Sequence, residues 1–291
     1  MAARPDTELD PRYGSRRLAA SSTAEQVHDY FRDTYYADVD RGDKGVDIKR
    51  SMDGGEAADA QRDWMSKTLY ADIAWTLSEF APGKRILDAG CGTGDLLTEL
   101  KDLGFDAGGA ELAPAAASVA RAKGHTVSEG AFETLSVDEP LDAILFMHVL
   151  SHAADPQAML QYARNLLAPG GIVLIRSGND FNPLQTVLSD DKGHGDFWVT
   201  GDHQHYFTFD SVERLLEASG FEPIYKQSDF PMEMIALMGD DFIADPSLGK
   251  PAHDKRVAFE TSLPAETRRQ LYRALANTGM GRCLLMAGRA R

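Results

Sequence analysis

The segment from Arg85 to Asp95, RILDAGCGTGD, constrains this chain more than any other. An apolar run ends in an acidic residue, and glycines then occupy every second position before a helical pattern resumes. That order is typical of a strand, a tight turn and a helix start. Glycines permit a positive φ and allow a ligand to lie against bare main chain, while a helix start presents unpaired N–H groups. The turn is therefore expected to bind a small adenosine-type cofactor.

The spacing of the glycines separates two classes of cofactor. Dinucleotide enzymes carry G-x-G-x-x-G, whose helix start receives a pyrophosphate, whereas this chain has Gly90-x-Gly92-x-Gly94 with Asp88 just upstream. A carboxylate there repels a pyrophosphate but can hydrogen-bond a cationic amino group. Residues 86–94 resemble motif I of the class I S-adenosylmethionine (SAM) methyltransferases. The resemblance implies that SAM, and its product S-adenosylhomocysteine (SAH), are bound by Asp88, Ala89, Gly90, Cys91, Gly92 and Gly94.

A second landmark lies in the same expected strand–helix–strand unit. Glu111 ends the short strand 106–111, 17 positions after Gly94. In nucleotide-binding α/β folds an acidic residue at about this spacing contacts a ribose hydroxyl. The resemblance implies that Glu111 accepts both ribose hydroxyls of SAM. It also places Leu112 and Met147 beside the cofactor.

The loop 130–135 falls where the family places an acidic residue and a loop against the adenine ring. This chain has Ala131 where the family carries an aspartate. Phe132 then stacks on the adenine, or Glu133 supplies the oxygen that the aspartate would have given. The alternative is that Phe132 is a core residue, because aromatic side chains in loops after parallel strands are often buried. Ala131, Phe132 and Glu133 complete the expected cofactor-binding set.

Composition limits the partners of the chain. Its 45 acidic and 30 basic residues give a net charge of −15, and no basic stripe with interleaved aromatic residues is present. Such a field repels phosphate backbones, so we expect a small-molecule acceptor and no nucleic acid. Two cysteines are too few for a disulfide framework, which favours a reducing cytoplasm. The longest apolar runs are too short to span a membrane, and no membrane partner is expected.

Strand and helix patterns alternate from Arg85 onward, which predicts a doubly wound, Rossmann-like α/β fold. The resemblance implies seven strands, with the last one, 283–289, antiparallel. We divide the chain into a flexible N-terminal arm (1–22), an N-terminal helical lid (23–82), a SAM-binding core (83–230), and a helical insertion with the final strand (231–291). Two helices, 24–36 and 61–80, are expected in the lid, with a loop over 42–55 between them. The Met-rich run 231–238 caps the acceptor pocket, forms a homodimer face or belongs to the core; the sequence leaves all three open.

Four histidines are candidates for a general base. His148 and His152 share a face if their segment is helical, and His203 and His205 follow in a long aromatic loop together with Trp198. The segment 146–156 resembles the one that follows the fourth strand in ubiquinone- and menaquinone-pathway methyltransferases, where it lies beside the transferring methyl group. A neutral imidazole can remove a proton from an attacking hydroxyl or amine. Alternatively, His148 only lines the wall of the pocket as a polar residue, and His152 holds the loop in place through a structural hydrogen bond.

The same segment raises the question of a metal ion. Some quinone-pathway relatives carry two glutamates and a histidine here, whereas this chain has His148, Ser151 and His152. Histidines at i and i+4 often bind metals, but a third ligand would have to come from His203 or Asp202. Because the carboxylates are missing from the segment, we expect no metal.

The sequence thus predicts a SAM-dependent methyltransferase acting on a small molecule through oxygen, nitrogen or carbon, in biosynthesis or secondary metabolism. An NAD-dependent oxidoreductase is disfavoured by the glycine spacing. A non-catalytic SAM-binding protein remains an alternative, because one fold serves several functions.

Overall fold

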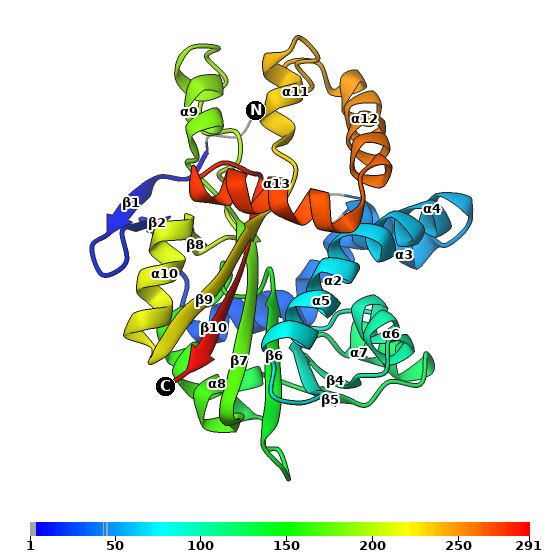
Figure 1. Cartoon of the computed structure of the whole chain (residues 1–291). Coiled ribbons are helices and arrows are strands. Elements are labelled where there is room, and N and C mark those ends of the chain that lie inside the picture. The colour runs from blue at the N-terminus through cyan, green and yellow to red at the C-terminus, as the bar shows by residue number, and fades with distance from the viewer. Residues whose placement is uncertain (1–3, 43, 45) are drawn as a thin grey trace.

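The computed structural model describes residues 4–42, 44 and 46–291 and contains the predicted seven-stranded sheet (Figure 1). The strands lie in the order β5-β4-β3-β6-β7-β10-β9. Their bounds are β3 Arg85–Ala89, β4 Asp106–Glu111, β5 Val127–Glu129, β6 Leu141–Met147, β7 Leu167–Gly178, β9 Phe221–Ser228 and β10 Cys283–Ala290. Only β10 runs against its neighbours in this sheet, pairing antiparallel with both β7 and β9. The doubly wound, Rossmann-like prediction is confirmed.

Helices cover both faces of the sheet because each presents an apolar stripe to it. On one face, α5 (Ala71–Phe80), α6 (Asp95–Asp102) and α7 (Pro114–Ala122) bury residues such as Ile73, Leu97 and Ala117. On the other face, α8 (Pro156–Leu166) and α10 (Phe209–Ala218) bury Leu160 and Leu215. The carboxyl ends of the parallel strands stay free of these layers, which leaves that edge for ligands.

Within the predicted flexible arm, residues 7–18 have regular structure. They form a hairpin of β1 (Thr7–Asp10) and β2 (Ser15–Leu18), which pairs with the short strand β8 (His205–Tyr206). Tyr13 is only 1% exposed, and its hydroxyl donates to Gln157 Oε1 at 2.6 Å. One buried aromatic side chain and pairing with a distant strand therefore anchor a segment whose composition alone indicated disorder.

The two predicted N-terminal helices are present and each contains a π-helical turn. The first consists of α1 (Ala24–Asp29), η1 (Tyr30–Thr34) and α2 (Tyr35–Arg41), and the second of α4 (Glu56–Met65), η2 (Ser66–Tyr70) and α5. A short helix, α3 (Val46–Asp53), occupies part of the predicted loop. π-Turns inside helices are frequent at functional sites, and both of these turns border the cavity described below.

The predicted insertion before the last strand is helical and stands at the carboxyl edge of the sheet (Figure 1). It contains α11 (Met232–Leu237), η4 (Pro246–Leu248), α12 (Gly249–Ser262) and α13 (Ala265–Asn277). Met232 and Ile235 are buried against Ala252 within the insertion, while Met238 is 76% exposed. The remaining elements are η3 (Phe132–Thr134) and α9 (Pro183–Asp190).

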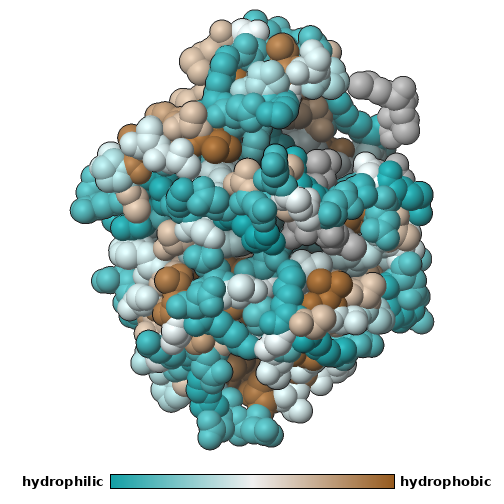
Figure 2. Space-filling view, turned by 90° about the vertical axis from the view of Figure 1, so that its right-hand side faces the viewer, coloured by the Kyte–Doolittle hydropathy of each residue, from teal (hydrophilic) through white to brown (hydrophobic). Residues whose placement is uncertain are grey.

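The face shown in Figure 2 is largely hydrophilic, with apolar residues scattered over it. Among the helices of the described residues, none combines the length and the apolar character needed to cross a membrane.

Candidate active site

The glycine-rich turn after β3 requires glycine by its backbone. Gly90, Gly92 and Gly94 have φ of 75°, 55° and 79°, all in the left-handed region that other residues seldom adopt. A Cβ on Gly90 would lie 2.7 Å from Val149 Cγ2. Gly94 is also the N-cap of α6, so the start of that helix faces the turn. The turn thus offers bare main chain to a ligand, although the N–H groups of its glycines already bind within the protein, those of Gly90 and Gly94 to carbonyl oxygens and that of Gly92 to Glu111.

Asp88 is poised to bind a cation beside this turn. Its side chain is buried, and Oδ1 has no hydrogen-bond partner among the described residues. Burial, together with the nearby charge of Glu111, raises the pKa of Asp88 to about 8. A buried, unpartnered carboxylate is unfavourable, so a ligand with an ammonium group fits this position. The amino group of SAM is such a group.

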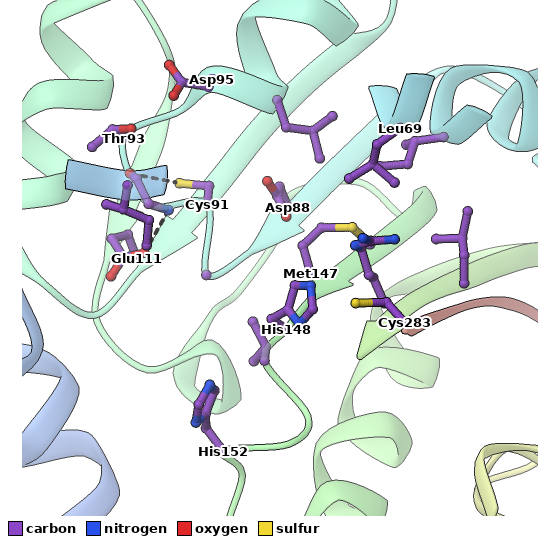
Figure 3. A pocket seen from close by; sticks show the side chains of 18 of the residues that line it. Leu69, Asp88, Cys91, Thr93, Asp95, Glu111, Met147, His148, His152 and Cys283 are labelled. Carbon is purple, nitrogen blue, oxygen red and sulfur yellow. Dashed lines mark hydrogen bonds between the residues drawn. The ribbon is translucent and has the colours of Figure 1, made fainter. Parts of the chain in front are cut away.

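Glu111 is held against the turn by main-chain hydrogen bonds. Its Oε2 accepts the N–H of Gly92 at 2.8 Å, and its Oε1 accepts the N–H of Ala113 at 2.9 Å. Burial raises the pKa of Glu111, and these bonds oppose that shift. The carboxylate oxygens keep lone pairs that can accept ribose hydroxyls. In Figure 3, Glu111, Cys91 and Thr93 lie on one side and Met147, His148 and Cys283 on the other, with Asp88 between them.

The loop predicted from the sequence to lie against the adenine ring forms part of the wall of the same cavity. Phe132 is 5% exposed and packs edge-on against Phe146 and Tyr162, with ring centroids 5.2 and 5.6 Å away. It therefore belongs to the core and also lines the cavity. Glu133 lines the cavity too, with its Oε2 3.9 Å from His28 Nε2.

The segment that carries His148 and His152 is a turn and not a helix, so the two side chains do not share a helix face. His148 follows β6 with a φ of 59°, a strained value for a residue other than glycine that is often found at functional sites. Its N–H donates to the carbonyl oxygen of Arg176 at 2.8 Å. The side chain is exposed to the cavity yet enclosed by protein. This enclosure and the charge of Arg176 lower the pKa of His148.

His152 is fixed in one tautomer. Its Nδ1 lies 2.9 Å from the carbonyl oxygen of Asp202, and a carbonyl only accepts, so Nδ1 carries the proton and Nε2 the lone pair. The ring of His203 lies 4.7 Å from that of His152, centroid to centroid. Burial, with the nearby His203, lowers the pKa of His152 to about 4. His152 is therefore neutral at physiological pH and can accept a proton.

These residues surround one cavity of about 910 Å³, within the range expected for ligand pockets. Most of the predicted site residues meet in its wall: Asp88, Gly90, Cys91, Gly92, Glu111, Leu112, Phe132, Glu133, Met147, His148, His152 and His203. The sequence did not single out other wall residues, including Phe31, Arg176, Asp229 and Arg256. Only the apolar spacing of the N-terminal helices gave a signal for Phe31.

Several predicted residues do not reach this wall. Ala89, Gly94 and Ala131 are sequence neighbours of residues that line the cavity, but they do not line it themselves. His205 is buried in β8, stacked 5.7 Å from the ring of Phe207, so it does not join the other histidines. Trp198 packs against Phe181 instead of the cavity. His205 is held in this position because β8 pairs with β2 of the N-terminal hairpin.

His152, Asp202 and His203 form a group whose ligand atoms lie within 4.8 Å of one another, a spacing compatible with a metal ion. The carboxylate of Asp202 is already bound by Lys44 Nζ at 2.9 Å.

A family model described as a methyltransferase domain matches residues 58–226. The chain is 32% identical to the ubiquinone biosynthesis O-methyltransferase of Dinoroseobacter shibae over 181 residues, which cover 57% of this chain and 71% of that protein. The protein of the same name from Cereibacter sphaeroides is 32% identical over 180 residues, covering 56% and 70%.

Solved structures show the same fold at low sequence identity. A SAM-dependent methyltransferase from Archaeoglobus fulgidus is 14% identical, with a TM-score of 0.53 over 88% of this chain and 100% of that one. Magnesium protoporphyrin IX methyltransferase from Synechocystis, crystallised with SAH, is 18% identical, with a TM-score of 0.51 over 70% and 92%. The unpartnered Asp88, the glycine turn and the family match agree, and the chain belongs to the class I SAM-dependent methyltransferase family.

Proposed function

We propose that this protein transfers the methyl group of SAM to a hydroxyl oxygen of a small-molecule acceptor, with His152 as the general base. The fixed tautomer of His152, at the wall of the cavity that also holds Asp88 and Glu111, carries the proposal. The relatives named above, which are O-methyltransferases, support oxygen as the receiving atom. The net charge of −15 supports a small acceptor over a nucleic acid.

Bound SAM supplies a methyl group that is already activated by its sulfonium. Asp88 and the glycine turn hold the amino acid part of the cofactor, and Glu111 holds the ribose. The cavity walls align the acceptor with the methyl group and exclude water, which is the main contribution that a protein makes to such a transfer. As the acceptor oxygen attacks, its proton passes to Nε2 of His152. The carbonyl oxygen of Asp202 keeps the imidazole oriented during this step.

The low basicity of His152 favours particular acceptors. A base whose pKa is about 4 takes a proton more readily from a phenol, with a pKa near ~10 as in tyrosine, than from an aliphatic alcohol. A phenol-like hydroxyl is therefore the best match to this site. His148 and His203 line the same cavity and are the next candidates for the base.

We propose that residues 23–82 act as a lid over the cofactor. Phe31, Tyr35 and Tyr36 of this segment line the cavity, and a Cβ on Gly92 would lie 3.2 Å from the hydroxyl oxygen of Tyr36. The lid thus covers the turn at the point where the main chain is bare. Residues 83–230 are the proposed SAM-binding core, and residues 231–291 its insertion and final strand.

The test is to incubate the purified protein with methyl-labelled SAM and small-molecule extracts, and to identify the labelled product and its methylated atom. With that acceptor, His152→Gln is expected to lower kcat by about 10²–10⁴-fold. His194→Gln is the matched control, because His194 bonds Asp241 outside the cavity wall. Label on nitrogen or carbon, or an unchanged kcat in His152→Gln, contradicts the proposal. Tight SAH binding without any labelled product supports the non-catalytic alternative.

A further inference from the structure

The cavity extends past the histidines into a second part, which we call the arginine lobe. It lies between the ends of β7 and β9 and the helices α4, α5, α12 and α13, and the α12–α13 segment stands over it at the carboxyl edge of the sheet (Figure 1). We define it by nine cavity-lining residues: Trp64, Asp72, Arg176, Gln227, Asp229, Arg256, Glu260, Arg268 and Tyr272. The cofactor residues described above lie in the other part.

Arg176 connects the lobe to the place of methyl transfer. In the sheet it pairs with Met147 on one side and Leu285 on the other. All three residues line the cavity, so they form one cross-strand row on its floor. The carbonyl oxygen of Arg176 accepts the N–H of His148. One ligand can therefore contact the Arg176 guanidinium with one of its groups and face His148 with another.

Arg176 has hydrogen-bond donors to spare. A guanidinium carries five N–H donors. Among the described residues the guanidinium of Arg176 donates one hydrogen bond, from Nη2 to Asp229 Oδ2 at 3.0 Å. Its side chain remains 11% exposed in a position that lines the cavity. Arg268 is 2% exposed, and its buried Nε likewise has no partner among the described residues.

The carboxylates of the lobe, in contrast, each accept several hydrogen bonds from protein groups. Asp229 Oδ2 also accepts from Arg256 Nη2 at 3.2 Å, and its Oδ1 accepts the N–H of Cys283 at 2.7 Å. Glu260 accepts from Arg256, Trp64 and Tyr272.

Asp72 is the third carboxylate of the lobe. It accepts from Arg268, Arg269 and Gln227. Within the lobe, three carboxylates face three guanidinium groups: Asp72, Asp229 and Glu260 against Arg176, Arg256 and Arg268, while Arg269, which also binds Asp72, lies outside the cavity lining. The ion pairs thus occupy the carboxylates of the lobe, whereas Arg176 keeps N–H donors without a protein partner among the described residues.

We infer that the methyl acceptor carries a carboxylate, and that Arg176 binds it in the arginine lobe. A planar carboxylate with two oxygen atoms matches paired N–H groups of a guanidinium. Trp64 and Tyr272 line the same lobe, each with little exposed surface. This inference rests on the proposed function, because it assigns the acceptor class of the same site. The ion pairs that join the insertion to the core use one donor of Arg176, and the other N–H groups of its guanidinium have no protein partner among the described residues.

The test measures binding to the SAH-loaded protein by ligand-observed NMR, with matched pairs of one carboxylate and its neutral amide: benzoate and benzamide, phenylacetate and phenylacetamide, 3-phenylpropionate and its amide. Phenyl phosphate is added as a different anion. At least one carboxylate is expected to bind about tenfold more tightly than its amide. Arg176→Gln is expected to abolish that preference while the SAH affinity stays within about twofold. Arg164→Gln, an exposed arginine outside the cavity wall, is expected to keep it.

A second variant covers the case in which Arg176→Gln does not fold. Arg176→Lys keeps the charge beside Asp229 but loses the paired N–H groups, so the carboxylate preference is expected to fall at least threefold. The inference is overturned if no carboxylate is preferred to its amide, if the preference survives in both Arg176 variants, or if phenyl phosphate binds more tightly than every carboxylate. A carboxylate preference without any methylated product contradicts the proposed function alone, whereas methylation of a neutral acceptor contradicts this inference alone.

Discussion

The unpartnered carboxyl group of Asp88 predicts that cofactor affinity depends on pH. In the free protein its pKa is about 8, so the group is mostly protonated below that pH. Binding places the ammonium group of SAH beside it, which lowers the pKa and releases the proton. The affinity therefore rises with pH and levels off above about 8. Between pH 8 and pH 6 the association constant is expected to fall about 50-fold, or ~2.3 kcal/mol, as a single titrating group requires.

Isothermal titration calorimetry at pH 6, 7, 8 and 9 measures this dependence. Titrations in two buffers with different ionisation enthalpies count the protons released, which should approach one at pH 6 and almost none at pH 9. Asp88→Asn is expected to bind SAH weakly at every pH and to lose the slope. Asp106→Asn, an exposed residue at the start of β4, is expected to retain it. An affinity in the unaltered protein that changes less than threefold from pH 6 to 8 refutes the role given to Asp88.

Three further substitutions test the rest of the site. Glu111→Gln replaces one accepting oxygen by an amide donor that faces the N–H of Gly92 or of Ala113, so SAH should bind at least tenfold more weakly by calorimetry while the protein stays folded. Gly92→Val forces a branched side chain to a φ of 55°, which costs about 1–3 kcal/mol; a lower Tm and loss of SAH binding are expected. Asp229→Asn leaves the buried charge of Arg176 uncompensated and Arg256 with Glu260 alone, so urea unfolding should show a loss of about 3–5 kcal/mol. An unchanged value in any of these measurements contradicts the corresponding reasoning.

The cofactor half of the site could be predicted because its information is local. The residues Asp88 to Gly94 are contiguous, and their φ angles and the drop from strand to turn are dictated by neighbours in the chain. Glu111 follows at the end of the next strand, which pairs directly with the first. Pattern, backbone conformation and position at the sheet edge all agree at these residues.

The acceptor half could not be predicted in the same way. Arg176, Asp229 and Arg256 are each unremarkable in sequence, and they meet only because β10 inserts between β7 and β9 and the insertion turns back over the sheet. His205 does not line the cavity, and the reason is again a pairing between distant segments. Its spacing from His203 suggested a common pocket, but pairing of β8 with β2 turned it toward Phe207. No local pattern encodes either of these pairings.

The two halves of the site also differ in what holds them. The cofactor half depends on main-chain conformation, which tolerates few residue types at the glycines. The arginine lobe depends on side-chain ion pairs and hydrogen bonds that join separate segments: Asp72 of α5 pairs with Arg268 of α13, and Trp64 of α4 donates to Glu260 of α12. Replacing a residue of the lobe changes the shape and charge offered to the acceptor and leaves the turn after β3 intact. Acceptor specificity in this fold can therefore diverge through the insertion and the lid while the binding of SAM is preserved.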